Sequence, residues 1–372
     1  MSVFKKEKLN IKVKKARKSP YLKTSYSKDM VIEAFDTPFR KKWTVLGLLI
    51  VITFPFFASS YFVHIANLIA ISCIAALALN LLCGNAGLLS LGHAGFMAAG
   101  AFTTAIMAVN FKMPIWVVLP TAGIVGAILG FIAGLPSLRL KGIYLGLSTL
   151  AMHYVIHYGC SEYQFHGGFG FGIKVDDPRI GPVVLSDDRV WYFVLWILVW
   201  GTALYIKNLL RSRPGRAWIA IHNRDIAAEI IGINIGYYKV LAFVVTSSIT
   251  AMAGSLYAYY TNVASIDEYS FILTIYYLAM IIVGGMGSVL GSLMGAFLIT
   301  ILPYILVYIT DFLEISGVVK NFFFAVQSGV FGLVIILFLL IEPLGLAEIW
   351  RRIRVFFQLW PFRFKPLQVT KR

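Results

Sequence analysis

Charged residues are scarce in this sequence of 372 residues. They make up 13% of the chain, whereas soluble domains carry about 25%. Hydrophobic residues reach 59% and aromatic residues 15%, which is typical of a surface that faces lipid and its two interfaces. This composition excludes an ordinary soluble domain and favours a chain that crosses a membrane several times.

Cysteine is also rare. Cys73, Cys83 and Cys160 are an odd number, and their spacing predicts neither a disulfide framework nor a zinc site. A phosphate-binding loop of the form G-x-x-x-x-G-K-[ST] is missing, so the chain has no ATPase site of that kind. A cleavable signal peptide is not expected either, because the first apolar stretch begins only at Trp43, after a long polar tail.

The net charge of +16 is confined to the two tails. Residues 1–42 hold 13 Lys and Arg against four acidic residues, and residues 349–372 hold seven Lys and Arg without an acidic residue. Residues 43–348 are therefore neutral. Basic tails beside apolar spans are typical of cytoplasmic segments attracted to anionic lipid. No nucleic-acid recognition module accompanies the charge, so we expect no nucleic-acid partner.

Ten stretches come close to the roughly 20 apolar residues that a helix needs to cross the hydrocarbon core. They are residues 43–59, 61–82, 87–109, 114–135, 142–158, 190–210, 237–260, 270–284, 289–310 and 322–342. With both termini in the cytoplasm, the basic tails and eight basic loop residues lie inside, and nine acidic loop residues lie outside. We predict an all-α polytopic bundle over residues 43–348, with cytoplasmic tails 1–42 and 349–372.

Two connections between the predicted spans are long. The outer stretch 159–189 is rich in glycine and acidic residues and is long enough to fold over the outer face. The inner stretch 207–236 is predicted to be a cytoplasmic helix whose apolar positions alternate with charged ones; these are Ala217, Ile219, Ala220, Ala227, Ala228, Ile230 and Ile231. This apolar face has no membrane to enter, so we expect it to bury against a protein partner.

No Asp, Glu, Lys or Arg lies deep inside any predicted span. Transporters driven by protons or sodium keep such residues in the membrane as relays or ion ligands. An ion-coupled secondary transporter is therefore disfavoured, although backbone carbonyls can also bind sodium. If this chain moves a solute uphill, we expect the energy to come from another subunit.

Glycine-rich segments join two pairs of predicted spans. Residues 84–95 contain four glycines, and Gly284, Gly285 and Gly287 lie between the eighth and ninth spans. Small residues let helix backbones approach closely, and broken helices can line a translocation path with exposed backbone groups. Four nearby polar residues have the same two interpretations, helix packing or path lining: Asn80, Asn85, Ser90 and His93.

Two residue pairs could suggest other chemistry. Ser90 and His93 could act as nucleophile and base in a membrane hydrolase, but the sequence offers no acidic residue at membrane depth to orient the imidazole. His153 and His157 have a spacing that can bind metal, but a third ligand is not evident. We therefore predict no catalytic residue and no metal site, and a membrane enzyme or a permease-derived scaffold stays a weaker alternative.

Four glycine-containing motifs follow one another along the chain. The first is the run from Asn80 through Gly84, Gly87, Ser90-Leu91-Gly92-His93 and Phe96 to Gly100. The others are Arg139-Leu140-Lys141-Gly142-Ile143-Tyr144, then Gly215-Arg216-Ala217 with Ala227-Ala228-Glu229 and Gly232-Ile233-Asn234, and finally Gly284-Gly285-Met286-Gly287-Ser288. In register, these four motifs resemble the bacterial branched-chain amino-acid ABC permeases of the LivM and LivH type, a family that includes urea and amide importers. The second motif and the long outer loop fit the LivM branch better.

The resemblance implies an importer in the bacterial inner membrane, with a fold of about ten transmembrane helices similar to the vitamin importers. Its implied partners are two ABC ATPase subunits that carry ATP and Mg²⁺, a second LivH-like permease and a periplasmic solute-binding protein, besides membrane lipid. This chain itself is then expected to bind no cofactor. The implied ATPase-docking residues are Arg216, Arg224, Asp225, Ala228, Glu229 and Gly232.

Two departures from the family pattern bear on partners and substrate. His166 stands where the family usually has Thr before the paired glycines of the outer loop. The docking segment reads Ala220-Ile221-His222-Asn223-Arg224-Asp225, where the family more often has A-I-R-E-[DN]-[ED]. The spans carry no charge that would match an amino acid's ammonium or carboxylate, so the sequence leaves branched-chain amino acids, urea and amides open as substrates.

Overall fold

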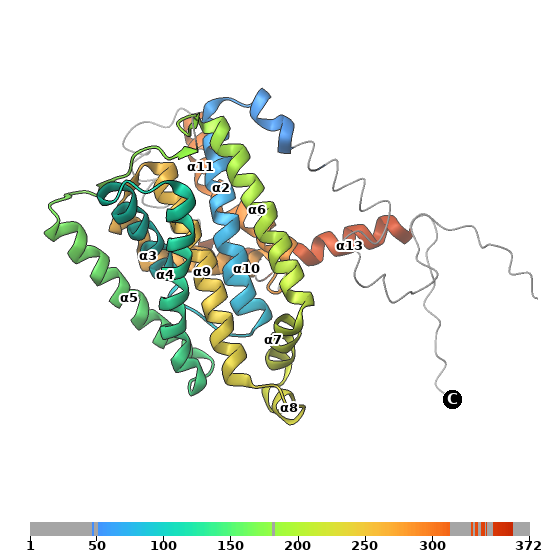
Figure 1. Ribbon diagram of the computed structural model, residues 1–372. Helices are drawn as coiled ribbons and strands as arrows, with labels where there is room; N and C mark the ends of the chain where they lie inside the picture. The colour runs from blue at the N-terminus through green and yellow to red at the C-terminus, as the bar shows by residue number, and fades with distance from the viewer. Residues whose placement is uncertain are drawn as a thin grey trace, which may run out of the picture. The chain divides into compact units, whose positions relative to one another are not determined.

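The computed structural model describes residues 47, 51–180, 183–312, 329, 332–333, 336–338, 340 and 345–359. Residues 59–355 form one compact unit, and residues 1–58 with 356–372 form a second. The first unit holds nearly all of the described helices (Figure 1).

The described part of the chain is a bundle of α-helices with a few short strands, which confirms the predicted all-α polytopic class (Figure 1). The longer helices are α2 (Ser60–Asn80), α3 (His93–Ala105), α4 (Ile115–Gly134), α5 (Ile143–His166), α6 (Asp188–Arg211), α9 (Ile235–Thr261), α10 (Phe271–Gly284), α11 (Val289–Phe312) and α13 (Leu346–Leu359). The shorter helices are α7 (Arg213–Asn223) and α8 (Asp225–Ile230). Short π-helical segments extend α2 (η2, Leu81–Asn85) and α3 (η3, Ile106–Asn110), and a 3₁₀-helical segment extends α4 (η4, Leu135–Leu138).

Four of these helical segments are long and apolar enough to cross a membrane: Ser60–Asn85, Ile115–Leu138, Asp188–Arg211 and Ile235–Thr261. Phe271–Gly284 and Val289–Ile305 are shorter apolar helices. Eight of the ten predicted spans thus coincide with α2, α3, α4, α5, α6, α9, α10 and α11. Residues 51–57 of the predicted span 43–59 are helical, while the rest of its first half and most of the predicted span 322–342 lie outside the described residues, so the count of ten stays a prediction.

Three predicted boundaries were wrong by several residues. The helix predicted from residue 87 begins at His93, because the glycine-rich stretch before it takes an irregular course in which Gly87 has a φ of +69°. Helix α5 continues to His166, so the first part of the predicted outer loop 159–189 is helical. Helix α6 continues to Arg211, so the predicted inner helix 207–236 does not begin at residue 207. In its place the chain forms two short helices after α6, namely α7 and α8.

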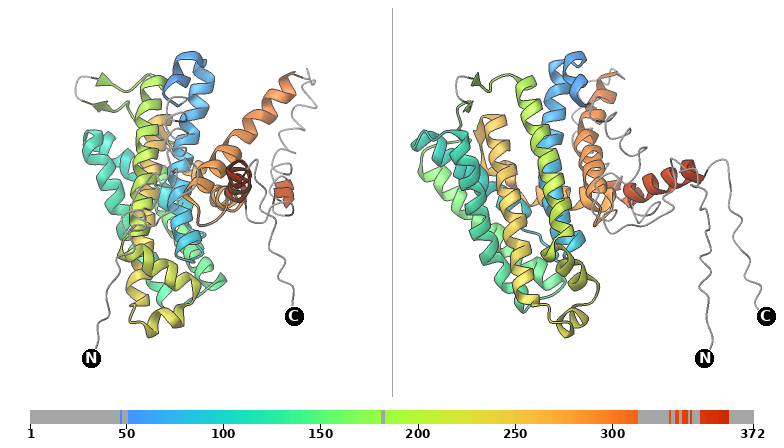
Figure 2. Two further views of the ribbon diagram at one scale, coloured as in Figure 1. Left: turned by 90° about the vertical axis from the view of Figure 1, so that its right-hand side faces the viewer. Right: turned by 45° about the vertical axis from the view of Figure 1, so that its right-hand side comes forward.

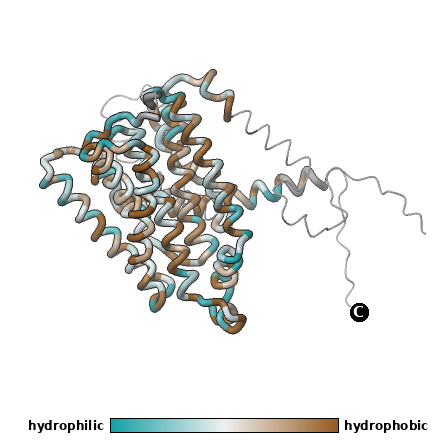
Figure 3. Tube along the Cα trace, viewed as in Figure 1, coloured by the Kyte–Doolittle hydropathy of each residue, from teal (hydrophilic) through white to brown (hydrophobic). Residues whose placement is uncertain are grey.

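Helices α2 and α9 form the centre of the bundle. Helix α2 packs against α6, α9, α10 and α11, and α9 packs against α3 and α4 as well. Almost every side of α2 is therefore covered, and 89% of its most apolar stretch is buried. Figure 3 shows hydrophobic residues along the length of the central helices and hydrophilic residues near their ends.

The two predicted loops lie at opposite ends of the helices (Figure 2). At one end, β1 (Ile173–Lys174) pairs with β4 (Val263–Ala264), and β2 (Arg179–Ile180) pairs with β3 (Val183–Val184), both antiparallel. Gln164 fixes this end, because its amide oxygen accepts from the Ile266 N–H of η5 (Ile266–Tyr269) at 3.0 Å and its amide nitrogen donates to the Gly170 carbonyl at 3.0 Å. Helices α7 and α8 lie at the other end.

Glycines bring the backbones of α3 and α9 into contact. A Cβ atom at Gly100 of α3 would overlap the carbonyl group of Ala251, and one at Gly254 of α9 would overlap the carbonyl group of Met97. Reciprocal small residues of this kind allow membrane helices to approach until their backbones touch. The close crossing of α3 and α9 therefore depends on glycine, which has no Cβ atom, at both positions.

We predict that Gly100→Ala lowers the thermal unfolding midpoint of the detergent-purified chain, because the new methyl group forces the two helices apart at a cost of about 1–3 kcal/mol. The matched control is Gly201→Ala on α6, where a Cβ meets nothing within 4 Å. Alanine is favoured over glycine in a helix interior, so this control is expected to hold or raise the midpoint. Equal midpoints for the two variants would contradict the backbone contact at Gly100.

Candidate functional site

The two glycine-rich segments predicted from the sequence lie against each other in the structure. Asn80, near the end of α2 and only 1% exposed, connects them. Its side-chain oxygen accepts from the Gly287 N–H at 2.7 Å, and its side-chain nitrogen donates to the Ser288 carbonyl at 3.1 Å. A Cβ at Gly84 would overlap the backbone nitrogen of Gly287. The sequence predicted each segment separately and gave no sign that they meet.

The turn between α10 and α11 needs glycine for two reasons. Gly285 and Gly287 have φ values of +109° and +80°, a region that side chains disfavour. Gly284 and Gly291 lie with their backbones in contact, so that the start of α11 crosses directly over the end of α10. Helix α10 has 14 residues and is about 21 Å long, shorter than the roughly 30 Å hydrocarbon core. The helical course is therefore interrupted between α10 and α11, and a role of this break in lining a translocation path stays a prediction.

The irregular stretch before α3 and the first turn of α3 are held by threonines of neighbouring helices. The Leu91 N–H donates to Thr149 Oγ1 of α5 at 2.9 Å, and the Ala94 N–H donates to Thr274 Oγ1 of α10 at 3.0 Å. Irregular backbone at membrane depth is tolerated only where its polar groups find partners inside the protein. Sequence reasoning missed these threonines, because a single Thr in an apolar helix carries no pattern that distinguishes it.

His93 begins α3 and is buried. Its Nδ1 lies 3.4 Å from Thr250 Oγ1 of α9, and its ring stands edge-on to Tyr277 of α10 with centroids 5.0 Å apart. The Thr250 hydroxyl donates to the Thr246 carbonyl at 2.8 Å, so its oxygen can accept a hydrogen bond from the N–H at Nδ1 of the imidazole. Through these contacts His93 joins α3, α9 and α10.

The four predicted path-lining residues Asn80, Asn85, Ser90 and His93 are all buried. Asn85 donates to the Asn80 carbonyl at 3.3 Å, and the Ser90 hydroxyl accepts from the Gly92 N–H at 3.4 Å. In this arrangement the four side chains bond to the chain itself, as the packing interpretation expects. A role of the same residues in lining a path stays a prediction.

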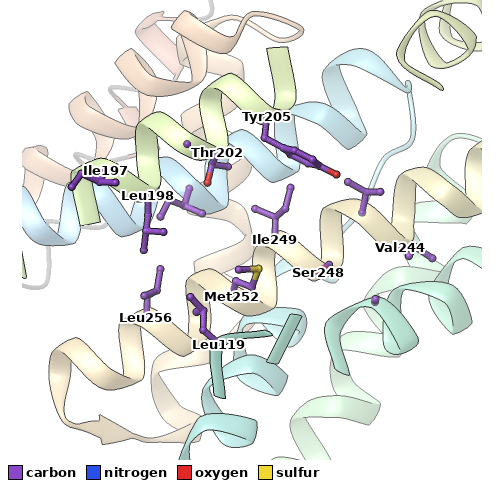
Figure 4. Close-up of a pocket in the computed structure, with 14 residues that line it drawn as sticks. Leu119, Ile197, Leu198, Thr202, Tyr205, Val244, Ser248, Ile249, Met252 and Leu256 are labelled. Atoms are coloured by element: carbon purple, nitrogen blue, oxygen red, sulfur yellow. The ribbon is translucent and has the colours of Figure 1, made fainter. Parts of the chain in front are cut away.

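A cavity of about 540 Å³ lies elsewhere in the bundle, between α2, α4, α6 and α9 (Figure 4). Apolar side chains such as Leu119, Ile197 and Ile249 make up most of its wall, and Thr202, Tyr205 and Ser248 add a few polar groups. Side chains of α6 and α9 face one another across it (Figure 4). None of the predicted site residues reaches this cavity, and its apolar wall suits a hydrocarbon better than a charged solute.

The predicted docking residues lie on α7, α8 and the turn that follows. Arg216, Arg224, Glu229 and Gly232 are exposed, Asp225 is half-buried, and Ala228 is only 2% exposed. Ala228 packs inside the chain and holds the turn after α8, where the Ile233 N–H donates to its carbonyl at 3.0 Å. The surface open to a partner is therefore formed by the charged residues and not by Ala228.

The apolar positions of this segment divide between two faces. Ala217 and Ala228 are buried in the chain, together with Trp218, whose indole N–H donates to the Tyr238 carbonyl of α9 at 2.7 Å. Ile219 and, on or next to α8, Ile226, Ile230 and Ile231 are exposed. The expectation of a single apolar face was wrong, because Ala217 and Ala228 pack inside the chain while the isoleucines point outward. The exposed isoleucines form a smaller apolar patch.

An ion pair joins α8 to the start of α5. Lys141 Nζ donates to the Asp225 carboxylate, and the Ile226 N–H donates to the other carboxylate oxygen at 2.9 Å. The Lys141 ammonium and then the Ile226 N–H hold the pKa of Asp225 below its usual range, so Asp225 is ionised at neutral pH. Two of the four sequence motifs thus meet here, which the sequence did not indicate.

Among the described residues, no group of three or more His, Cys, Asp and Glu side chains is placed to hold a metal ion. His153 and His157 lie close together, with ring centroids 5.7 Å apart. Both belong to α5 and are far in sequence from the other predicted site residues.

Comparison with known proteins matches residues 61–339 to the model of a family described as branched-chain amino acid transport system / permease component. A relative in Escherichia coli K12, named high-affinity branched-chain amino acid transport system permease protein LivM, is 31% identical over 302 residues, which cover 72% of this chain and 69% of the relative. A LivM protein of Salmonella typhimurium is 31% identical over 293 residues, 69% of this chain and 67% of the relative.

A probable LivM protein of Methanocaldococcus jannaschii is 29% identical over 180 residues, 46% of this chain and 51% of the relative. No solved structure matches the chain. The matched region contains both glycine-rich segments, the Lys141–Asp225 ion pair and the α7–α8 segment.

We predict that Asn80→Ala destabilises the chain, because the Gly287 N–H and the Ser288 carbonyl lose their partner and each unpaired buried group costs about 1–3 kcal/mol. The measurement is the thermal unfolding midpoint in detergent. Asn208→Ala, an exposed asparagine of α6, is the matched control and is expected to leave the midpoint unchanged. If Asn80→Ala unfolds at the same temperature as the control, Asn80 does not hold the two segments together.

We also predict that Lys141→Glu speeds amide hydrogen exchange in α8, because it replaces an attraction by a repulsion. The double variant Lys141→Glu with Asp225→Lys restores the pair with reversed charges and is expected to return the exchange to the original rate. The lowered pKa of Asp225 keeps the natural pair intact above the usual Asp range, and the pair is lost only as the pH falls through the lowered pKa. The exchange rate in α8, corrected for the intrinsic effect of pH, is therefore expected to stay constant from pH 6 to pH 8. Failure of the double variant to restore slow exchange would contradict the pairing.

Proposed function

This chain belongs to the family of permease components of branched-chain amino acid transport systems, and from that premise we propose that it is the membrane-spanning permease of an ATP-driven ABC importer. In this proposal it moves a branched-chain amino acid that a periplasmic binding protein delivers. The observation that carries the proposal is the family match over residues 61–339, which includes the exposed segment α7–α8. As a permease component, the chain is a multi-pass membrane protein and not an enzyme.

The position of α7–α8 supports docking of an ATPase. The segment lies at the end of the bundle opposite the β1–β4 and β2–β3 strand pairs (Figure 2). It presents Arg216, Arg224 and Glu229 beside exposed isoleucines. A patch that combines apolar anchors with charged residues of both signs fits a protein surface better than a membrane surface. We propose that the charged residues select and orient the partner while the isoleucines supply buried area.

The proposed mechanism is alternating access driven from outside the chain. Two ATPase subunits bind ATP and Mg²⁺, close on each other and push α7–α8. Trp218 anchors this segment to α9, and the ion pair of Lys141 with Asp225 links it to the start of α5. Movement of the segment is therefore passed to two membrane helices. This chain contributes the passage, and the partners contribute the energy and their bound nucleotide.

The proposed placement is the bacterial inner membrane, with both termini in the cytoplasm. It puts α7–α8 and the basic residues Arg139 and Lys141 inside, and the acidic stretch around Asp176 and Asp187 outside, which is the charge distribution that membrane insertion favours. A second permease subunit of the LivH kind is proposed to complete the membrane part. The choice among branched-chain amino acids is assigned to the binding protein.

Uptake of labelled L-leucine into proteoliposomes tests the proposal. We expect uptake only when the chain is reconstituted with both ATPases and the second permease, with the binding protein outside and ATP inside. Leucine accumulation by the isolated chain, driven by an ion gradient without ATP, would contradict the proposal.

We predict that the double reversal Arg224→Glu with Glu229→Lys abolishes co-purification of the ATPases and ATP-dependent leucine uptake, because it inverts the charge pattern without changing net charge. The matched control is Lys174→Glu with Asp176→Lys, an equally neutral reversal of two exposed residues at the opposite end. This control is expected to leave co-purification unchanged. Retention of the ATPases by the first variant would remove Arg224 and Glu229 from the docking surface.

A further inference from the structure

Helix α13 differs from the membrane helices in its polarity. It has 14 residues, as many as α10, but unlike α10 it is not among the apolar helices of the chain. Hydrophobic and hydrophilic residues follow one another along it (Figure 3). A helix of this length and composition is too short and too polar to cross the hydrocarbon core. Its apolar side chains therefore need a different surface to cover them.

The apolar side chains of α13 gather on one face. Residues three and four apart share one side of a helix, and the apolar residues recur at that spacing: Leu346, Ile349, Trp350, Ile353 and Phe356. Leu346 packs against the apolar core of the bundle. Trp350, Ile353 and Phe356 are exposed, and we call these three the α13 apolar stripe. Tryptophan is enriched where a protein meets the interface between membrane and water.

Basic residues outnumber acidic ones on α13. Its one acidic residue, Glu348, accepts from the Arg351 guanidinium through both carboxylate oxygens at 2.7 Å, and Arg352 Nε lies 3.5 Å from the same carboxylate. Both arginines are exposed. Residues 349–372 hold seven Lys and Arg residues and no acidic residue. The helix and the sequence that follows it therefore carry a surplus of positive charge.

This charge pattern differs from that of the α7–α8 segment. That segment presents Arg224 and Glu229, which are exposed charges of opposite sign, and a mixed pattern suits a protein surface with complementary charges. Charge of one sign beside exposed tryptophan and phenylalanine is instead typical of helices that lie in a membrane interface. The negative charge that complements it is that of anionic lipid headgroups, which attract each nearby Lys and Arg.

The start of α13 is fixed to the bundle. Gly345 has a φ of +78°, and a Cβ at this position would overlap the backbone nitrogen of Gly285 in the α10–α11 turn. The same turn touches η2 through Gly287 and Gly84, and η2 contacts α7. The turn therefore lies toward the α7–α8 end of the bundle. Under the proposed placement that end is cytoplasmic, so α13 begins on the cytoplasmic side.

We propose that α13 lies along the cytoplasmic surface of the membrane and binds anionic lipid. The α13 apolar stripe enters the region where headgroups meet acyl chains, and Arg351 and Arg352 lie among the phosphate groups. Arginine suits this position, because its apolar stem can lie along lipid while its guanidinium stays at the headgroups. Since Gly345 joins the helix to the α10–α11 turn, the bound helix holds that turn at a fixed depth. Lipid binding by α13 goes beyond the proposed function, and only the side of the membrane rests on the proposed placement.

Spin-label accessibility in the full chain tests the position of α13. The three native cysteines are replaced by alanine, and a single cysteine replaces Ile353 or Trp350 on the stripe. Arg351→Cys, on the other side of the helix, is the matched control. Each labelled chain is placed in a bilayer of phosphatidylcholine and phosphatidylglycerol in equal parts. Collision rates are measured with oxygen, which enters lipid, and with a nickel chelate, which stays in water.

We expect labels at Ile353→Cys and Trp350→Cys to collide with oxygen about threefold more often than with the nickel chelate, and the label at Arg351→Cys to show the reverse. Ready access of the nickel chelate to all three labels would overturn the inference, because α13 would then lie in water. Protection of both stripe positions from both reagents would overturn it too, because a protein would then cover the stripe. If Ile353→Cys fails to fold, Trp350→Cys decides.

Lipid charge separates an anionic surface from one that is merely apolar. In phosphatidylcholine alone, and for Arg351→Gln with Arg352→Gln in the mixed bilayer, we expect the nickel collision rate at Ile353→Cys to rise about threefold. The matched control is Lys112→Gln with Lys174→Gln, two exposed basic residues in the connections before α4 and after α5, which is expected to leave the rate unchanged. Equal rates in the two bilayers would overturn the assignment to anionic lipid. The proposed function fails on a different result, namely leucine uptake that does not need ATP.

Discussion

The structure depends on one constraint: every backbone N–H and carbonyl group at membrane depth needs a partner inside the protein. Two stretches interrupt the helices, residues 86–92 before α3 and residues 285–288 between α10 and α11. Asn80 supplies the partners for Gly287 and Ser288. Thr149 of α5 supplies one for Leu91 of the first stretch, and Thr274 of α10 supplies one for Ala94 in the first turn of α3. Without these buried side chains the two breaks would leave backbone groups unpaired in an apolar surrounding.

The same constraint explains where glycine is placed. A side-chain amide reaches only a few ångströms, so Asn80 can bond to the α10–α11 turn only if α2 and that turn touch. Contact between Gly84 and Gly287 provides this distance. The α10–α11 turn also needs positive φ values at Gly285 and Gly287. Hydrogen bonding and close packing at this point are therefore one arrangement, because either would fail without the other.

Much of the fold could be predicted from the sequence, because apolar stretches of about 20 residues have few solutions in a membrane. Eight spans and the position of the α7–α8 segment follow from that rule. Their partners in space did not follow. The contact of Asn80 with Gly287 and the ion pair of Lys141 with Asp225 each join residues that are far apart in sequence, and neither pair has a local pattern. The burial of Ala228 was missed for the same reason, since helical periodicity shows a face without showing what covers it.

The start of α5 is joined to the α7–α8 segment by an ion pair. Lys141 pairs with Asp225 of α8, and Gly142, with a φ of +59° and no atoms near the position of a Cβ, separates Lys141 from the first turn of α5. A glycine in this conformation lets the helix change direction relative to the anchored lysine. Since α5 has few neighbours besides α3, tilting it disturbs less packing than moving α2 or α9 would. Under the mechanism that we propose, a push on α8 would pass through the ion pair of Lys141 with Asp225 to α5.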